Sequence, residues 1–133
     1  MSKGTESISY EVVKIGKVSA IDRQKCMARV YFEDRDDFVS SWMPVMQKNT
    51  MNHKFYWMPD VDEQVVCLFL PNGHETAIII GSIYSEADKP VPEIAEEGKD
   101  RIGIWIDAGN YIKWIEEERT FEIKTENPVR WLT

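Results

Sequence analysis

Acidic side chains are the most abundant groups that could do chemistry in this chain, and their spacing argues against a catalytic site. The run Glu116–Glu118 could supply an acid and a base. Consecutive residues of a strand point to opposite faces, however, so these carboxylates do not converge, and we interpret the run as a solvated turn. The segment Asp34–Asp37 has the alternating aspartates that begin a calcium loop, but it lacks the glycine and the distant glutamate of an EF-hand loop.

The serine hydroxyls also lack the sequence motif and the nearby base of a catalytic nucleophile. Ser40, Ser41 and Ser82 lie outside any G-x-S-x-G context, and only His53 and His74 could serve one of them as a base. A catalytic triad is therefore disfavoured. We predict that the protein is not an enzyme and has no catalytic residues.

The two cysteines stand apart. Cys26 and Cys67 each lie inside an apolar, strand-like run, and neither has clustered ligands nearby in the sequence. We interpret them as two reduced core thiols of a protein made in the cytoplasm. No metal site and no cofactor are expected.

A group of aromatic residues offers an alternative function. Aromatic rings on a small β-barrel can stack on bases or sugars, and nearby cations would help to bind a single-stranded nucleic acid or a glycan. Rings also pack cores and protein interfaces, where aromatic residues are enriched. A net charge of −7 disfavours binding to phosphate backbones, so we favour the packing interpretation. The group consists of Trp42, Phe55, Tyr56 and Trp57, with Arg35, Lys48 and Lys54 beside it.

Composition and length favour one domain with a short appendage. The chain has 133 residues, of which 43% are hydrophobic, enough for a core. Its longest apolar runs, 65–70 and 77–80, are strand-sized and far short of the roughly 20 residues that a membrane helix needs. The first 14 residues lack an apolar signal region, so we expect synthesis in the bacterial cytoplasm.

Strand patterns dominate the first 84 residues. Val12–Ile21 is rich in β-branched residues, and alternation over Cys26–Phe32 predicts a half-buried strand. Val39–Met46 is a third strand candidate, and Gln64–Leu70 is apolar on both faces, which predicts a fully covered strand. Thr76–Tyr84 is the fifth strand.

The connections between these strands differ in character. Asn72-Gly73 between two apolar runs predicts a hairpin, and Gly81 predicts a bulge or a close backbone approach. Residues 47–55 are polar and irregular, although Met46, Met51 and Phe55 fall near the spacing of a short helix. Five strands with these connections suit a small barrel such as the OB-fold, in residues 1–85.

The last third of the chain is unusual. Residues 86–100 are acidic and carry two prolines, which is typical of a linker. Residues 102–106, 111–115 and 120–124 predict a meander of three short strands, which is marginal alone and has two open edges. Its apolar side must be covered, either by the barrel or by identical meanders from other copies, and the proline-bearing linker favours the copies. The residues of this predicted interface are Ile102, Ile104, Ile106, Ile112, Trp114, Phe121 and Ile123.

The chain resembles a known family, the baseplate assembly protein V or central spike protein of contractile phage tails and tail-like particles. The resemblance runs through the first strands, the block Ser41–Val45, the segment Met58–Val65, the following hairpin and the proline exit at 89–92. The residues that carry it include Gly16, Trp42, Pro44, Pro59, Glu63, Gly73, Gly81 and Tyr84.

Two departures from the family pattern stand out. Asp62 occupies the position where the family usually has a glycine, and aspartate tolerates a positive φ better than most residues. Family members often continue into a long β-helical needle with a His-x-His iron site. The sequence ends at Thr133, so we expect a short needle and no lysozyme-like domain. Neither of its two histidines forms that motif, which disfavours an iron-bound tip.

The resemblance implies an all-β homotrimer: a five-stranded OB-fold barrel in residues 1–85, a linker in 86–100 and an intertwined β-prism in 101–133. It implies a structural protein of the baseplate that lies beneath the hub protein and leads the tube through the target cell envelope. The implied partners are sister copies, the hub, a separate tip protein, and inner tube or tape-measure components. Trp131 and Leu132 could be a frayed end, but we favour the interpretation that they cap the prism or dock the tip protein. Nucleic acid is not among them.

Overall fold

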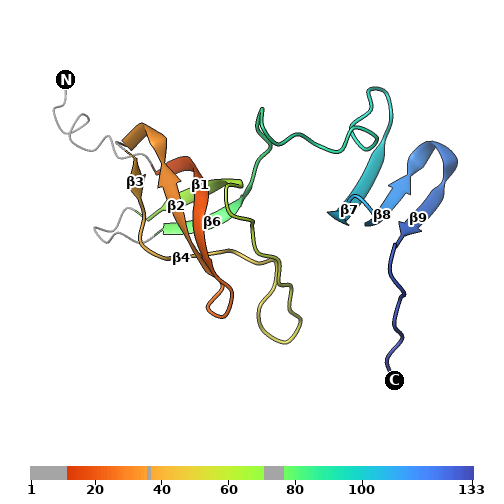
Figure 1. The fold of residues 1–133 in the computed structure, drawn as a ribbon, viewed down its shortest axis with the longest axis horizontal. Coiled ribbons are helices and arrows are strands. Elements are labelled where there is room, and N and C mark those ends of the chain that lie inside the picture. The colour runs from red at the N-terminus through yellow and green to blue at the C-terminus, as the bar shows by residue number, and fades with distance from the viewer. Residues whose placement is uncertain (1–11, 36, 71–76) are drawn as a thin grey trace. The chain divides into compact units, whose positions relative to one another are not determined.

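A computed structural model of the chain describes residues 12–35, 37–70 and 77–133 (Figure 1). It forms two compact units, Met1–Asp88 and Lys89–Thr133. Regular structure within the described residues is confined to β-strands and two single-turn 3-10 helices, so the predicted all-β class is confirmed. The elements of the first unit are β1 (Val13–Asp22), β2 (Met27–Phe32), η1 (Glu33–Arg35), β3 (Phe38–Val39), β4 (Met43–Pro44), β5 (Gln64–Phe69) and β6 (Ala77–Ser82).

One antiparallel sheet organises the first unit, in the order β3-β2-β1-β5-β6, with β4 also paired to β2. The strand β1 is ten residues long and pairs with both β2 and β5, so that Lys17 lies opposite Tyr31 on one side and Gln64 on the other. Just beyond β4, Val45 forms a parallel bridge with Ile79 of β6. The fully buried core consists of Val18, Ala28, Val30, Phe32, Met43, Val65, Cys67, Ala77 and Ile79.

The predicted third strand, Val39–Met46, is wrong as a single element, because it is divided into β3 and β4. Three residues separate Val39 from Met43, whereas two residues separate their partners Tyr31 and Ala28 on β2. The extra residue forms a bulge. Ser40 turns its side chain inward there, and its hydroxyl accepts a hydrogen bond of 2.9 Å from the backbone N–H of Val30. The buried hydroxyl thus satisfies a backbone group that a continuous ladder would have paired.

The short helix predicted within residues 47–55 is also wrong, because this segment has no regular structure. Met46, Met51 and Phe55 are exposed, so no apolar stripe is buried that could stabilise a helix. Hydrogen bonds specific to a loop replace helical ones, such as the bond from the Phe55 N–H to the Asn49 carbonyl.

Coverage of β5 is one-sided. Val65 and Cys67 are fully buried, whereas Val66 and Leu68 on the other face are only half-buried. The prediction that both faces are covered is therefore wrong for the single chain. The bulge predicted at Gly81 is confirmed by the shift in register opposite Val66. The Asn72-Gly73 turn lies outside the described residues, although the strands on either side of it pair as predicted.

The cysteines are both free thiols. Cys67 lies in the core, where burial raises its pKa to about 11. Cys26 is only partly buried and has a positive φ of 56°. The interpretation of two core thiols is therefore right for Cys67 and only partly right for Cys26.

The second unit is a meander of three strands in the order β7-β8-β9. Its elements are β7 (Arg101–Asp107), β8 (Asn110–Ile115), η2 (Glu116–Glu118) and β9 (Thr120–Lys124), within one residue of the predicted strands. Asp107 stabilises the turn between β7 and β8, because its Oδ1 accepts hydrogen bonds from the Gly109 N–H and the Asn110 side chain.

The segment before β7 makes contacts of its own with the meander. Glu93 forms an ion pair with Lys113 of β8, and Glu96 forms one with Arg101 at the start of β7, each at 3.3 Å. The backbone carbonyl of Glu93 also accepts a hydrogen bond from Arg101. Residues 89–100 therefore belong to the second compact unit.

Candidate assembly surfaces

One face of the meander is apolar and open. Backbone register places Ile104, Ile112 and Ile123 side by side across the three strands, and strand alternation places the next row on the same face. Six of the seven residues of the predicted interface lie on this face, which we call the isoleucine face. Trp114 is half-buried and the other five are exposed in the single chain. The second row consists of Ile102, Trp114 and Phe121, whereas Ile106 is exposed at the shift in register between Trp105 and Asp107.

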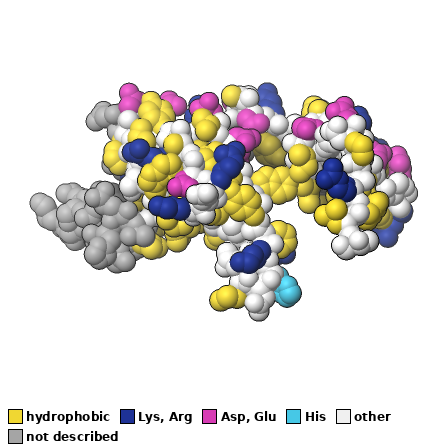
Figure 2. All heavy atoms as spheres, turned by 60° about the horizontal axis from the view of Figure 1, so that its bottom comes forward, with side chains coloured by type: hydrophobic (Ala, Val, Ile, Leu, Met, Phe, Trp, Pro, Cys, Tyr) yellow, Lys and Arg dark blue, Asp and Glu magenta, His cyan; other side chains and the backbone are white. Residues whose placement is uncertain are grey.

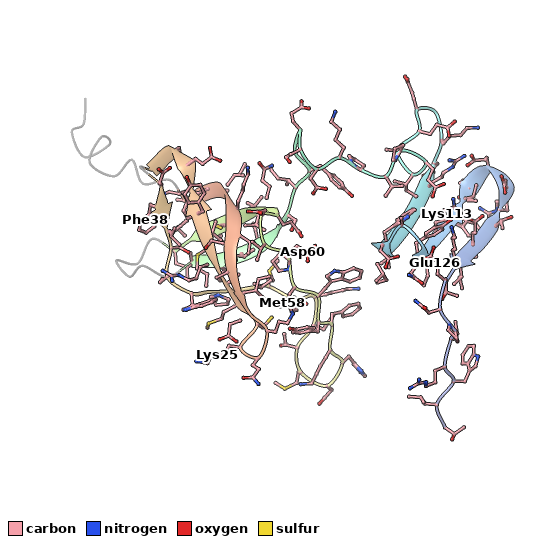
Figure 3. All side chains as sticks on the ribbon, in the orientation of Figure 1. Lys25, Phe38, Met58, Asp60, Lys113 and Glu126 are labelled. Atoms are coloured by element: carbon pink, nitrogen blue, oxygen red, sulfur yellow. The ribbon has the colours of Figure 1, made fainter. Side chains whose placement is uncertain are left out.

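The opposite face of the meander is closed by polar contacts. Lys113 is only 7% exposed, and its ammonium lies 3.3 Å from carboxylate oxygens of both Glu93 and Glu122 (Figure 3). Burial alone would lower the pKa of Lys113, but hydrogen bonds to the two glutamates outweigh burial, so this pKa is raised. Beside the lysine, the rings of Trp105 and Tyr111 stack with centroids 5.0 Å apart. The unit thus covers one of its faces with its own chain and leaves the isoleucine face bare.

Ion pairs also fix the ends of the strands. A hydrogen bond from the Arg101 guanidinium lowers the pKa of Glu117. A hydrogen bond from Arg119 and a second one from the Trp114 indole lower the pKa of Glu116. The glutamate run is thus a solvated turn, as predicted, with the carboxylates of Glu116 and Glu117 paired to cations.

These lowered pKa values predict loss of stability in acid. A carboxylate with a depressed pKa in the folded state stabilises the fold at pH values above its unfolded pKa of about 4.3, and this stability is lost as the pH falls through the folded pKa. We expect Glu117→Gln to lower the melting temperature of the second unit at pH 7. The melting temperature of this variant should also fall less steeply between pH 5 and pH 3 than that of the wild type. The indole NMR signals of Trp105 and Trp114 report on this unit alone.

Glu97→Gln is the matched control, because Glu97 is an exposed carboxylate of the same unit for which the described residues offer no ion pair. It is expected to leave both the melting temperature and its pH dependence unchanged. Equal effects of the two substitutions would contradict the role of the Arg101–Glu117 pair.

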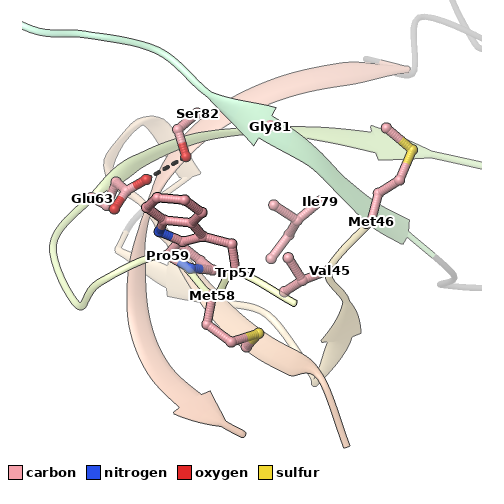
Figure 4. A pocket seen from close by; sticks show the side chains of 9 residues that line it. All are labelled: Val45, Met46, Trp57, Met58, Pro59, Glu63, Ile79, Gly81 and Ser82. Carbon is pink, nitrogen blue, oxygen red and sulfur yellow. Dashed lines mark hydrogen bonds between the residues drawn. The ribbon is translucent and has the colours of Figure 1, made fainter. Parts of the chain in front are cut away.

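The first unit carries a second exposed surface. Hydrophobic side chains are visible on the surface of both units in Figure 2. In the first unit the loop of residues 46–57, between β4 and β5, exposes Met51, Phe55, Tyr56 and Trp57. A pocket of about 220 Å³ lies at the base of this loop (Figure 4). Its lining consists of Val45, Met46, Trp57, Met58, Pro59, Glu63, Ile79, Gly81 and Ser82.

Glu63 fixes the polar rim of this pocket. One of its carboxylate oxygens accepts a hydrogen bond of 2.5 Å from the Ser82 hydroxyl, which ties the start of β5 to the end of β6. The other accepts a hydrogen bond of 2.9 Å from the Asp60 N–H. Both oxygens are thus committed to structure.

Comparison with known families assigns the first unit to a family. Residues 14–84, more than half of the chain, match the family described as the Type VI secretion system/phage-baseplate injector OB domain. The chain belongs to this family. A search of curated proteins finds no relative of the chain.

Membership of the injector OB-domain family confirms the resemblance to spike proteins and supports a structural role at a baseplate in general. Several residues that carried the resemblance have clear structural roles. Gly16 is buried where β1 crosses β2, and a Cβ atom there would lie 2.5 Å from Val30 and 2.7 Å from the Tyr31 carbonyl. Pro59 is buried, and Pro44 pairs with Met27.

Other members of that set lie at the surface. Trp42 is exposed, with the Arg29 guanidinium 5.9 Å from its ring centroid, and Tyr84 is exposed as well. Gly73 lies outside the described residues. Asp62, in the family's usual glycine position, has a φ of 76°, so it adopts the left-handed conformation that a glycine would.

Family membership supports a structural role, and the groups considered for catalysis occupy the following places. The described residues contain no group of three or more His, Cys, Asp and Glu that could hold a metal ion. Ser40 is buried in the strand bulge and Ser82 is bound to Glu63. In the described part of the chain, no helix is both long and apolar enough to cross a membrane.

Sequence reasoning missed Lys113 and its two glutamate partners. The signal was present, because a lysine alternates there with Ile112 and Trp114 and lies opposite a glutamate in the next strand. The terminal residues Trp131 and Leu132 are 87% and 84% exposed and lie beyond the last strand.

Proposed function

We propose that three copies of the chain assemble into the central spike of a contractile-tail baseplate. In this proposal the first unit is a five-stranded OB-fold barrel and the meanders of three copies form a short β-prism. The isoleucine face carries the proposal, because it consists of large apolar side chains in a closely spaced array that a soluble protein rarely leaves in water. Family membership supplies the context of the baseplate.

Threefold symmetry suits this surface. A three-stranded meander has two open edges and one open face, and a prism of three such sheets turns the open faces toward a common axis. Burying the isoleucine face contributes roughly 25 cal/mol for each Å² of apolar surface removed from water. The closed polar face, with Lys113 at its centre, would then lie outside.

The proposed spike acts mechanically. It organises the centre of the baseplate beneath the hub protein and leads the inner tube through the target cell envelope when the sheath contracts. Trp131 and Leu132 would cap the prism or dock a separate tip protein, since they expose large apolar surfaces beyond the last strand. Tube or tape-measure components are further proposed partners, and assembly takes place in a phage tail or a tail-like particle.

Sedimentation of the purified protein tests this proposal. We expect a species of three times 15.5 kDa that persists on dilution and in high salt, because its contacts are apolar. A monomer under these conditions would overturn the proposal.

A further inference from the structure

The loop of residues 46–57 is basic, apolar and structurally fixed, in a chain that is otherwise acidic. Its only charged side chains are Lys48 and Lys54, and the turn Asp22–Cys26 beside it adds Arg23 and Lys25. Loop and turn together hold four of the 16 Lys and Arg and one of the 23 Asp and Glu, so they carry +3. The remainder of the chain carries −10.

Hydrogen bonds hold the loop in one conformation. The side-chain amide of Gln47 closes it across its base, accepting from the Trp57 N–H at 2.8 Å and donating to the Trp57 carbonyl at 3.2 Å. The Tyr56 hydroxyl donates to the Arg23 carbonyl at 3.0 Å, which joins the loop to the turn. A preorganised surface loses little conformational entropy on binding.

The exposed side chains are of the kinds that form protein interfaces. Met51 is 80% exposed, and Phe55, Tyr56 and Trp57 are each more than half exposed. Methionine and aromatic residues are enriched at interfaces, and here cations surround them. The partner surface must therefore combine apolar side chains with carboxylates.

The end of β6 lies beside the base of this loop. Ser82 at the end of β6 lines the same pocket as Trp57, so the residues that follow β6 begin next to the loop. Further along, segment 86–100 is acidic, because it holds six carboxylates and two lysines, with Val91 and Ile94 among them. Two of these carboxylates, Glu93 and Glu96, also pair with Lys113 and Arg101 of their own copy. A second copy therefore offers a surface of complementary charge and suitable apolar content.

We propose that the loop of one copy binds the acidic segment 86–100 of the neighbouring copy. This inference rests on the proposed trimer, whose threefold axis brings the chain exits of the three copies to one end. Away from such an axis, a contact between adjacent copies joins two different surfaces, as a basic loop and an acidic segment do. The contact would join neighbouring copies independently of the isoleucine face.

Zero-length carbodiimide cross-linking of the full-length protein tests the contact, because this reagent joins lysines only to carboxylates in direct contact. We expect covalent dimers and trimers on a denaturing gel, in which peptides with Lys48 or Lys54 are linked to peptides from segment 86–100. These links should be scarce in the monomer band. They should diminish several-fold in 0.5 M NaCl, while the sedimenting trimer persists.

The double variant Lys48→Gln/Lys54→Gln is expected to remove these links and still sediment as a trimer. The control Lys17→Gln/Lys124→Gln removes two lysines elsewhere and should keep them. A wild-type trimer without such links, or with links confined to the monomer band, overturns the loop contact and leaves the spike proposal standing. A wild-type monomer overturns both. A gel-shift assay at low salt tests the nucleic-acid alternative. If the wild-type protein retards a single-stranded oligonucleotide and only Lys48→Gln/Lys54→Gln loses this effect, the loop binds nucleic acid and the proposed contact with segment 86–100 is overturned.

Discussion

Ile104→Asp is expected to convert the trimer to monomers without unfolding the first unit. Ile104 occupies the central row of the isoleucine face, opposite Ile112. A carboxylate there removes roughly 1.5–3 kcal/mol of apolar burial and places an unpaired charge among apolar groups. The effect occurs in each of three chains, so the penalty for one trimer is about 6 kcal/mol or more, which is at least four orders of magnitude in the assembly constant.

Sedimentation measures the loss of the trimer, and the indole signals of Trp42 and Trp57 show whether the first unit remains folded. Ile104→Val is the matched control, since it keeps an apolar β-branched side chain and is expected to remain trimeric. Persistence of the trimer in Ile104→Asp would show that the isoleucine face is not the contact between copies.

Gly16→Ala is expected to destabilise the first unit more than other conservative changes in it. An added methyl group would overlap the Val30 side chain and the Tyr31 backbone carbonyl, and a backbone atom cannot rotate away as a side chain can. Overpacking of this kind costs about 1–3 kcal/mol. The melting temperature of a unit of this size should fall by roughly 5–20 °C, measured by calorimetry.

Gly81→Ala is the control for this effect. A Cβ at Gly81 has no described atom within 4 Å, and this glycine is not among those with a positive φ. Alanine there is expected to be neutral, or to stabilise by about 0.4–1 kcal/mol through the entropy of the unfolded chain. Equal destabilisation by the two substitutions would show that steric overlap at Gly16 is not the cause.

The two faces of the meander are consistent with the proposed assembly through a unit this small. Three short strands are marginal when alone, and here Lys113, Glu93 and Glu122 complete one side of the sheet within the chain. The ion pairs of Arg101 and Arg119 add to this, with the screening expected of exposed groups. The remaining apolar face is then free to be shared between copies.

Local patterns determined the strands of the second unit. The alternation of Ile102 and Ile104 with Gly103 and Trp105 indicates a period of two, and this period places the two isoleucines on one face. The same reasoning located β2 and its buried residues. The turn at Asp62 was singled out by the family resemblance instead, and its residue type tolerates the positive φ found there.

Tertiary contacts decided the rest, because these depend on residues far apart in the chain. The division of Val39–Met46 follows from one extra residue opposite β2, and register between strands cannot be read from one strand alone. The helical spacing of Met46, Met51 and Phe55 did not predict a helix correctly, because a short apolar stripe stabilises a helix only where another element covers it. Burial of Lys113 likewise required Glu93 from another segment, since an unpaired ammonium would be too costly to remove from water.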